Sequence, residues 1–313
     1  MDTCQLDVNN AFLQGSLDED IYLAQPPGFI DRDRPTYVCK LYKVLYGLKQ
    51  AHRAWYNELR RFLLKSGFVN SLSDTSLFIL NRDGVCIYLL VYIDDIIISG
   101  DSSKAVQHYI DLLARRFSIR DLGPRSFFLG VEVTRTSGGL LLTQRRYISD
   151  ILSRHSMADA KPVPTPLAST SDLRLHSDIT LDDPSEYRQV LDNLQYLLFT
   201  HPDIAYVVNK LSQYMHRPTS DNWQALKRVL RYLGDTRSHG IFLSRSSPLT
   251  LHAFSDTDWR GDRDDFTSTR AHIVYLGHNP DSWSSKKQRF AAKSSIRKRN
   301  TNLFQPRLPR FNG

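Results

Sequence analysis

The sequence is poor in cysteine and contains no long hydrophobic run. Its three cysteines, Cys4, Cys39 and Cys86, lie far apart and form no disulfide pattern or zinc-binding spacing. We expect reduced, buried thiols in an intracellular protein, with cytoplasm and nucleus both open. No apolar stretch approaches the ~18 residues of a membrane span. The first residues also lack the basic and apolar regions of a signal peptide, so neither kind of segment is expected.

Acidic residues are missing from the C-terminal end. From Trp283 to Gly313 there are nine Lys or Arg and no Asp or Glu. Subtracting these nine from 41 basic residues leaves 32 against 33 acidic ones, so the rest of the chain has a net charge of −1 although the whole chain has +8. The global charge is therefore weak support for nucleic-acid binding, because the excess resides in the tail.

Strand-like and helix-like patterns alternate along the chain, of which 41% is hydrophobic. We expect strands at 3–8, 76–80, 85–92 and 96–99, a hairpin at 126–143, and helices at 48–66, 103–116, 185–199, 203–216 and 220–233. Residues 160–186 are rich in Pro, Ser and Asp and predict a linker. Strand patterns return at 240–244, 249–255 and 271–277. Together they predict an α+β protein with two or three domains.

Two adjacent carboxylates interrupt the apolar stretch LLVYIDDIIIS at residues 89–99. Asp94 and Asp95 could simply occupy a hairpin turn, where Asp is common. The same turn would fix two like charges at a sheet edge, and a divalent cation is the natural partner of crowded carboxylates. Asp7 ends another apolar strand. If that strand lies beside the hairpin, Asp7 and Asp94 could face one another, and three carboxylates around two Mg²⁺ ions ~3.5–4 Å apart suit in-line phosphoryl transfer.

Eleven short segments give these motifs a wider context. In chain order they are QLDVNNAFLQG, YLAQPPGF, VCKLYKVLYGLKQAHRAWY, LLVYIDDIIISG, SFFLGVEV, KPVPTPL, YRQVLDNLQYL, THPDIAYVVNKLSQYM, LKRVLRYL, FSDTDW and SWSSKKQ. This ordered set resembles the reverse transcriptase of copia-type LTR retrotransposon Pol polyproteins, as far as about Ser295. The resemblance implies a reverse-transcriptase palm with an antiparallel sheet and partial fingers at 1–150. It further implies a linker and helical thumb or connection at 151–240, and a truncated ribonuclease H-like α/β domain at 241–295.

The resemblance also assigns a polymerase site. Asp7, Asp94 and Asp95 match the family's catalytic carboxylates. Asp7 and Asp94 would be the principal ligands of two Mg²⁺ ions, and Asp95 would contribute more electrostatically. The implied partners are an RNA or DNA template-primer and dNTPs, without a membrane; the oligomeric state stays open.

Four further residues match substrate-contacting positions of the family. Tyr92 would lie near the primer end, unless it is simply a packed strand aromatic. Phe12 would be the steric gate that favours deoxynucleotides, unless it is a core residue. Lys49 and Gln50 stand in the GLKQ segment that lines the nucleotide pocket. The whole stretch 40–65 mixes basic and aromatic residues, which suits phosphate contact and base stacking but would also suit a solvated helix face.

Two departures from the family pattern bear on activity. The chain has only six residues before Asp7, so most of the fingers are expected to be missing, and truncation at both ends is expected. Asp256 matches the first ribonuclease H carboxylate, but the family's SSTEAEY reads SSIRKRN here. Residues 296–303 can be encoded by codons that, when translated from the third base onward, give TEAEYKSL, which continues the family's pattern. We therefore interpret 296–313 as a frameshifted tail. Asp256 would then be vestigial, because one carboxylate cannot build a two-metal site, and ribonuclease H activity is expected to be lost.

Two functions follow as hypotheses. The chain is an RNA-directed DNA polymerase fragment, or it is a non-catalytic retrotransposon remnant that at most binds nucleic acid. The intact carboxylates, inherited from the family, favour the polymerase. The expected absence of most of the fingers favours the remnant. A structural interaction protein built on the helices of 185–233 has little support, because their apolar faces are expected to pack on the palm.

Overall fold

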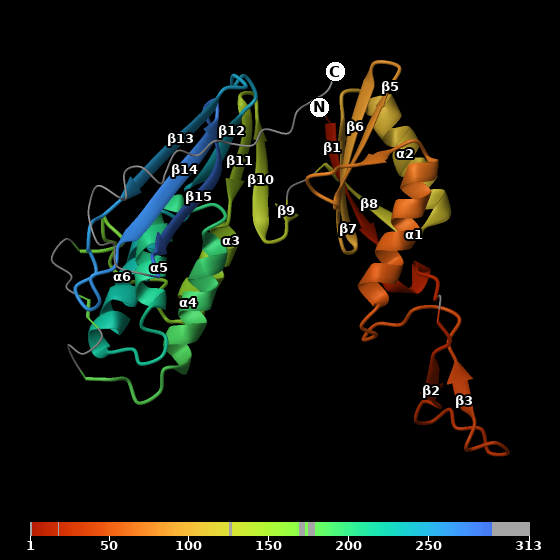
Figure 1. Ribbon diagram of the computed structural model, residues 1–313, viewed down its shortest axis with the longest axis horizontal. Helices are drawn as coiled ribbons and strands as arrows, with labels where there is room; N and C mark the ends of the chain where they lie inside the picture. The colour runs from red at the N-terminus through yellow and green to blue at the C-terminus, as the bar shows by residue number, and fades with distance from the viewer. Residues whose placement is uncertain (1, 18, 125–126, 169–172, 175–178, 290–313) are drawn as a thin grey trace. The chain divides into compact units, whose positions relative to one another are not determined.

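The structure is a computed structural model that describes residues 2–17, 19–124, 127–168, 173–174 and 179–289. It divides into two compact units, residues 1–125 and 126–313 (Figure 1). The expected domain borders at 150 and 240 differ from this division, and the domain assignment stays a prediction. The proposed frameshifted tail lies outside the described residues. Among the helices that are described, none is long and apolar enough to cross a membrane.

The first unit is built on a six-stranded antiparallel sheet in the order β4-β5-β6-β7-β1-β8. Its strands are β1 (Asp2–Val8), β4 (Val69–Asn70), β5 (Leu77–Arg82), β6 (Val85–Tyr92), β7 (Asp95–Gly100) and β8 (Ile119–Pro124). Helices α1 (Ala51–Lys65) and α2 (Ser103–Arg116) lie on one side of the sheet (Figure 1). A 3₁₀ turn, η1 (Ala11–Gln14), and a separate hairpin of β2 (Tyr22–Ala24) and β3 (Val38–Lys40) lie between β1 and α1. In this order β1 is an inner strand that lies between β7 and β8, next to the hairpin of β6 and β7.

The two faces of this sheet differ because successive side chains along a strand point to opposite sides. Leu6, Ile96 and Ile98 are fully buried in a core that α1 and α2 complete. Each such side chain contributes about 2 kcal/mol by leaving water. The opposite face alternates with them, and its residues Gln5 and Asp7 are half-buried. The sheet therefore has one apolar face against the helices and one face on which Gln5 and Asp7 stand beside apolar residues such as Ile97.

The expected elements of the first unit are confirmed. The helix at 103–116 and the strand at 85–92 have the same bounds in the structure, and the other three strands shift by one or two residues at their ends. The helix expected at 48–66 is shorter and ends before Gly67, whose φ of +94° suits a glycine just past a helix.

The second unit contains two antiparallel sheets and four α-helices among its described residues. Strands β9 (Phe127–Phe128), β10 (Val131–Thr136), β11 (Gly139–Thr143) and β12 (Gly240–Ser244) form one sheet, and β13 (Leu251–Thr257), β14 (Thr269–Leu276) and β15 (Asn279–Lys287) form the other. The helices are α3 (Arg145–Arg154), α4 (Ser185–Leu197), α5 (Ala205–Ser212), which follows the 3₁₀ turn η2 (Pro202–Ile204), and α6 (Ser220–Asp235). The expected hairpin, the three helical stretches and the three late strands are confirmed, whereas α3 and β15 were not expected.

The helices of the second unit share their own core. Fully buried side chains come from each of them, among them Ile148, Leu194, Val208 and Leu226. The start of α6 is fixed by a capping box, in which the Thr219 hydroxyl accepts from the backbone N–H of Asn222 and the Asn222 side chain accepts in return. The α+β class is thus confirmed for both units.

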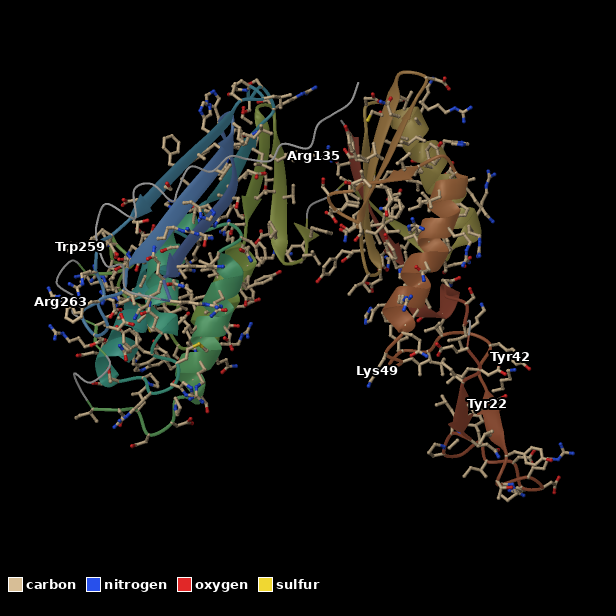
Figure 2. All side chains as sticks on the ribbon, viewed as in Figure 1. Tyr22, Tyr42, Lys49, Arg135, Trp259 and Arg263 are labelled. Atoms are coloured by element: carbon tan, nitrogen blue, oxygen red, sulfur yellow. The ribbon has the colours of Figure 1, made fainter. Side chains whose placement is uncertain are left out.

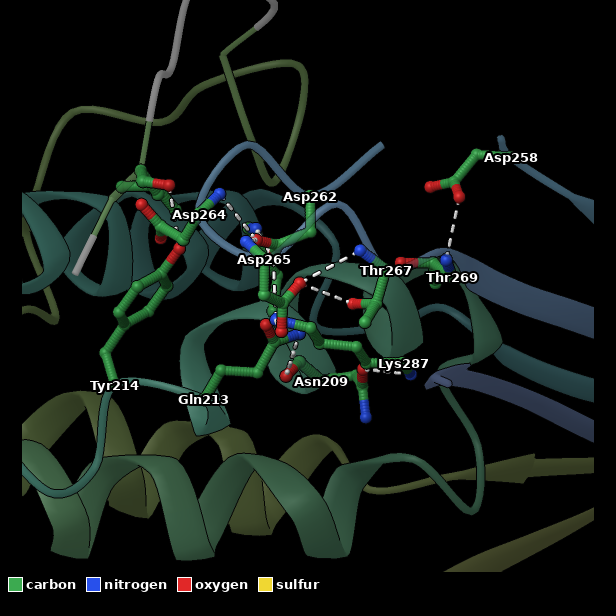
Figure 3. A network of polar contacts seen from close by, with 12 residues as sticks. Asn209, Gln213, Tyr214, Asp258, Asp262, Asp264, Asp265, Thr267, Thr269 and Lys287 are labelled. Carbon is green, nitrogen blue, oxygen red and sulfur yellow. Dashed lines mark hydrogen bonds and ion pairs between the residues drawn. The ribbon is translucent and has the colours of Figure 1, made fainter. Parts of the chain in front are cut away.

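A buried ion-pair network anchors the loop between β13 and β14 (Figure 3). The side chain of Asp262 is only 4% exposed, and its Oδ2 lies 2.7 Å from Lys210 Nζ on α5 and 2.9 Å from Lys287 Nζ on β15. Lys287 also pairs with Asp265 at 2.9 Å. Burial opposes ionisation of Asp262, but the two lysine hydrogen bonds outweigh it and hold its pKa far below the ordinary value. The loop is therefore fastened to a helix and a strand by charge.

Candidate active site

The three candidate carboxylates come together through the pairing of β1 with β7. Asp7 on β1 stands directly opposite Asp95 on β7. Tyr92 and Asp95 close the β6–β7 hairpin, so Ile93 and Asp94 form its two-residue turn. The backbone N–H of Val8 donates to the Asp94 carbonyl at 3.0 Å, which ties this turn to the end of β1. The expected adjacency is present, with the difference that the register places Asp95, rather than Asp94, across from Asp7.

The three carboxylates interact electrostatically. Burial raises the pKa of Asp7, and the charges of Asp94 and then Asp95 raise it further, while Arg120 lowers it. Arg120 is the partner of Asp7 on β8, on the side away from Asp95. Asp7 thus lies between a like charge on one neighbouring strand and an opposite charge on the other. A cation beside the three carboxylates would relieve their repulsion.

Gln5 fixes the position of Asp95. Its Nε2 donates to Asp95 Oδ1 at 2.6 Å. Gln5 precedes Asp7 by two residues, so both side chains lie on the same face of β1. The hydrogen bond therefore links two side chains on the face that carries Asp7. Sequence reasoning missed Gln5, because its contact depends on which strand pairs with β1.

The turn itself has an uncommon backbone conformation. Ile93 has a φ of +56°, which is rare for a β-branched residue. Its carbonyl accepts a hydrogen bond of 2.6 Å from the indole N–H of Trp55, which is only 1% exposed on α1. Trp55 lies on the buried face of this helix, together with Leu59 and Leu63. Its hydrogen bond to the turn was not foreseen, because spacing along a helix carries no information about the donor's partner.

The donor set suits magnesium in kind, since carboxylate oxygens are the ligands that this ion prefers. Within the described residues, however, no group of three or more His, Cys, Asp or Glu side chains is arranged so that it could hold a metal ion. Asp7, Asp94 and Asp95 would therefore have to move closer together around an ion. Rotation of exposed or half-buried aspartate side chains is a small change. The three carboxylates therefore suit magnesium chemically, although the structure does not hold them in a preformed metal site.

The candidate substrate residues fall into different environments. Phe12 lies on η1 and is 7% exposed. The centroid of its ring lies 4.6 Å from that of Tyr46 and 4.5 Å from that of His52. This packing meets the core interpretation, and the steric-gate role stays a prediction. Tyr92 is 51% exposed at the end of β6, so it is not a packed core aromatic. Its expected place near a primer end is a prediction.

Lys49 and Gln50 precede the first turn of α1. Gln50 is the N-terminal cap residue of that helix and lines an open pocket of 180 Å³ together with Ser16, Arg53 and Asn57. Lys49 is exposed and is labelled in Figure 2. The structure brings these two to the same helix start, and among the described contacts none joins them to the carboxylates.

The mixed basic and aromatic stretch 40–65 divides into two parts. Tyr42 and Tyr46 are 84% and 56% exposed, and Tyr42 projects from the segment that carries the β2–β3 hairpin (Figure 2). Trp55 is in the core, and the hydroxyl of half-buried Tyr56 donates to the Thr75 carbonyl at 2.7 Å. Tyr42 therefore exposes most of its ring to a ligand, while Tyr46 is exposed but already packs against Phe12.

Asp256 belongs to the second unit and lies on β13. It is exposed, and its Oδ1 accepts from the backbone N–H of Thr257 at 2.8 Å. It borders an open pocket of 420 Å³ that Asp258 and His272 also line. Its vestigial ribonuclease H role stays a prediction.

Known proteins resemble the chain over most of its length. A family model described as reverse transcriptase (RNA-dependent DNA polymerase) matches residues 2–169. The retrovirus-related Pol polyprotein from transposon RE2 of Arabidopsis thaliana is 58% identical over 291 residues, which are 93% of this chain and 20% of that protein. The one from transposon RE1 of the same plant is 59% identical with the same coverage.

A shorter relative is covered almost completely. The putative transposon Ty5-1 protein of Saccharomyces cerevisiae is 33% identical over 284 residues, which are 90% of this chain and 92% of that protein. The chain spans 20% of the length of the two plant polyproteins. By these similarities and by the motifs that its sheet brings together, the chain belongs to the reverse transcriptase family, among the Pol polyproteins of copia-type retrotransposons.

Proposed function

We propose that this chain is an RNA-directed DNA polymerase fragment in which Asp7, Asp94 and Asp95 carry out two-metal nucleotidyl transfer. Its substrates are dNTPs and a primed RNA or DNA template. The observation that supports this most is the pairing of Asp7 with Asp95 next to the Asp94 turn, on the face of the sheet away from the helices. Asp94 and Asp95 both repel Asp7, which has a cost in stability, and a site that binds cations accounts for it.

The residues divide the work between them. Magnesium, when bound, would activate the primer hydroxyl and stabilise the leaving pyrophosphate. Asp7 and Asp94 would supply the main oxygen ligands, as the family resemblance implies. Asp95, held by Gln5, would add negative charge to the site. Phe12, Lys49, Gln50 and Tyr92 would contact the nucleotide and the primer end.

The proposal extends to the parts of the chain. Residues 1–150 correspond to a palm with partial fingers, residues 151–240 to a linker and a helical thumb or connection, and residues 241–295 to a truncated ribonuclease H-like domain without activity. An intracellular location goes with this assignment. These roles rest on the family resemblance.

A non-catalytic remnant is the second candidate. Within the described residues the carboxylates are not already gathered around one position, so the polymerase requires them to move together around an ion, whereas a remnant does not. The two plant polyproteins are also much longer than this chain, so parts that bind the triphosphate could belong to other regions of a polyprotein. Such a remnant would at most bind nucleic acid.

Primer extension separates the two candidates. Purified chain is incubated with a primed RNA template, dNTPs and Mg²⁺, beside an Asp94→Asn/Asp95→Asn variant. We expect extension by the wild type and none by the variant. Absence of extension from wild-type protein that circular dichroism shows to be folded would reject the polymerase and leave the remnant.

A further inference from the structure

The turn that carries Asp94 is held in a conformation that its own sequence disfavours. A positive φ at the first position of a two-residue hairpin turn is normally the place of glycine. Here that position is Ile93, with a φ of +56°. Such a conformation persists only when the surrounding structure determines it, and it is found at functional sites. Something outside the hairpin must therefore hold this turn.

Trp55 is placed to do so. Its indole N–H donates to the Ile93 carbonyl at 2.6 Å, across 38 positions of sequence. The indole ring is almost completely buried and packs edge-on against Phe117 with the ring centroids 5.3 Å apart. A donor locked in this way by core packing cannot follow the turn if it moves, so it defines where the carbonyl lies.

A second tie holds the other residue of the turn. The Asp94 carbonyl accepts from the backbone N–H of Val8 at 3.0 Å. Both turn carbonyls thus bond to parts of the chain outside the β6–β7 hairpin, one to α1 and one to β1. The bond from Trp55 comes from a side chain, so a conservative side-chain substitution removes it and leaves the backbone bond of Val8 in place.

We propose that Trp55 is a positioning residue for the carboxylate turn: it holds Ile93 in its strained conformation and thereby sets Asp94 and Asp95 beside Asp7. It touches neither metal nor substrate. The claim that this positioning serves metal binding rests on the proposed function. The mechanical part of the proposal, that Trp55 determines the conformation of the turn, rests on geometry alone.

Hydrogen exchange on the metal-free full chain tests the mechanical part. The variants are Trp55→Phe, which keeps an aromatic ring but loses the donor, Ile93→Gly, and the two combined. We expect exchange in the peptide around residues 89–98 to become about fivefold faster in Trp55→Phe, as for the loss of one hydrogen bond. The double variant should return toward the wild-type rate, because glycine adopts a positive φ without strain.

Trp283→Phe is the matched control. Its indole N–H donates to the Leu198 carbonyl at 2.8 Å within the second unit, so it removes the same kind of bond elsewhere. It should leave exchange at 89–98 unchanged. Rescue by Ile93→Gly is the decisive readout, since a glycine in the turn cannot repair a defect in core packing. Wild-type exchange in Trp55→Phe, or a double variant as fast as Trp55→Phe alone, would overturn the proposal.

Binding of Mn²⁺, followed by electron paramagnetic resonance, tests the purpose. We expect affinity to fall about fivefold in Trp55→Phe and to recover in the double variant. If the exchange results hold while the wild type binds no Mn²⁺ and extends no primer, Trp55 still positions the turn and the polymerase function alone is rejected. Unchanged Mn²⁺ affinity in Trp55→Phe would overturn the role of Trp55 toward the carboxylates.

Discussion

Asp7 and Asp95 are direct cross-strand partners on β1 and β7, so two carboxylates face each other on neighbouring strands. Like charges in this arrangement destabilise a sheet, typically by 0.2–1 kcal/mol. Arg120 on the far side of Asp7 offsets only part of this, because the pKa of Asp7 remains raised by burial and by the two other aspartates. The fold therefore tolerates a local cost at the place where the family resemblance puts the chemistry.

Asp7→Asn is expected to stabilise the first unit at pH 7 by about 0.5 kcal/mol, because it removes one of the two facing charges. The same change is expected to abolish primer extension. Urea denaturation of the variant and the wild type measures the first effect. Asp33→Asn, at an exposed position outside the sheet, is the control and should change the free energy of unfolding little.

The gain from Asp7→Asn should depend on pH with a definite sign. The pKa of Asp7 is higher in the folded than in the unfolded state, so protonated Asp7 favours folding and this advantage is lost as the pH rises above that folded pKa. The variant should therefore be more stable than the wild type at pH 7 and equal to it well below the ordinary value of 3.8. A gain that persists undiminished at low pH would contradict the electrostatic cause.

Particular elements show what the sequence could predict. The α2 helix and the β6 strand were foreseen with their bounds, because each has a regular apolar pattern and clear ends. The α3 helix was missed although Ile148, Ile151 and Leu152 have helical spacing, so its signal was present. By contrast, β15 offers a single large apolar side chain, Trp283, among serines and lysines. It is a strand because β14 presents an edge for it, and such tertiary pairing overrides local preference.

The site was predictable in composition and unpredictable in geometry. Asp7, Asp94 and Asp95 were identified from their motifs, but the register that opposes Asp7 to Asp95 joins strands some ninety residues apart. A shift of the β1–β7 pairing by one residue would move every side chain of the strand to the other face of the sheet. No local sequence pattern determines this register. The contacts of Gln5 and Trp55 follow from that register and from the packing of α1, so they required the structure.

Asp262→Ala is expected to destabilise the second unit by about 3 kcal/mol, because it leaves Lys210 and Lys287 partly buried without their shared partner. Urea denaturation followed by tryptophan fluorescence measures this. Asp281→Ala changes an exposed aspartate on β15 and should cost less than about 0.5 kcal/mol. Equal effects of the two substitutions would mean that the network contributes nothing beyond a surface charge.

The network also predicts an acid transition. The pKa of Asp262 is lower in the folded than in the unfolded state, so its stabilisation is present above the ordinary value of 3.8 and is lost as the pH falls through the folded pKa. Stability of the wild type should thus drop below pH 4 more steeply than that of Asp262→Asn, measured by urea denaturation across that range.

Gly100→Ala is expected to destabilise the first unit by about 2 kcal/mol through overpacking. A methyl group there would lie 2.8 Å from Val106 Cγ2 and 3.1 Å from the Cys86 carbonyl oxygen, so α2 would have to move away from the sheet. Gly234→Ala on α6 is a control of opposite sign, because a methyl group there meets nothing within 4 Å and alanine favours the helix. Thermal unfolding of both variants checks the pair.

Phe12 offers a test that separates packing from substrate selection. Its ring is enclosed by Tyr46 and His52, so Phe12→Ala should lower the free energy of unfolding by about 3 kcal/mol through the cavity it leaves. Phe12→Leu keeps most of the volume and should cost less than about 1.5 kcal/mol. If Phe12 also excludes the ribose 2′-hydroxyl, the leucine variant will insert ribonucleotides more readily than the wild type in primer extension. Equal discrimination by the two would leave Phe12 as a core residue alone, because the stability loss would then be its whole effect.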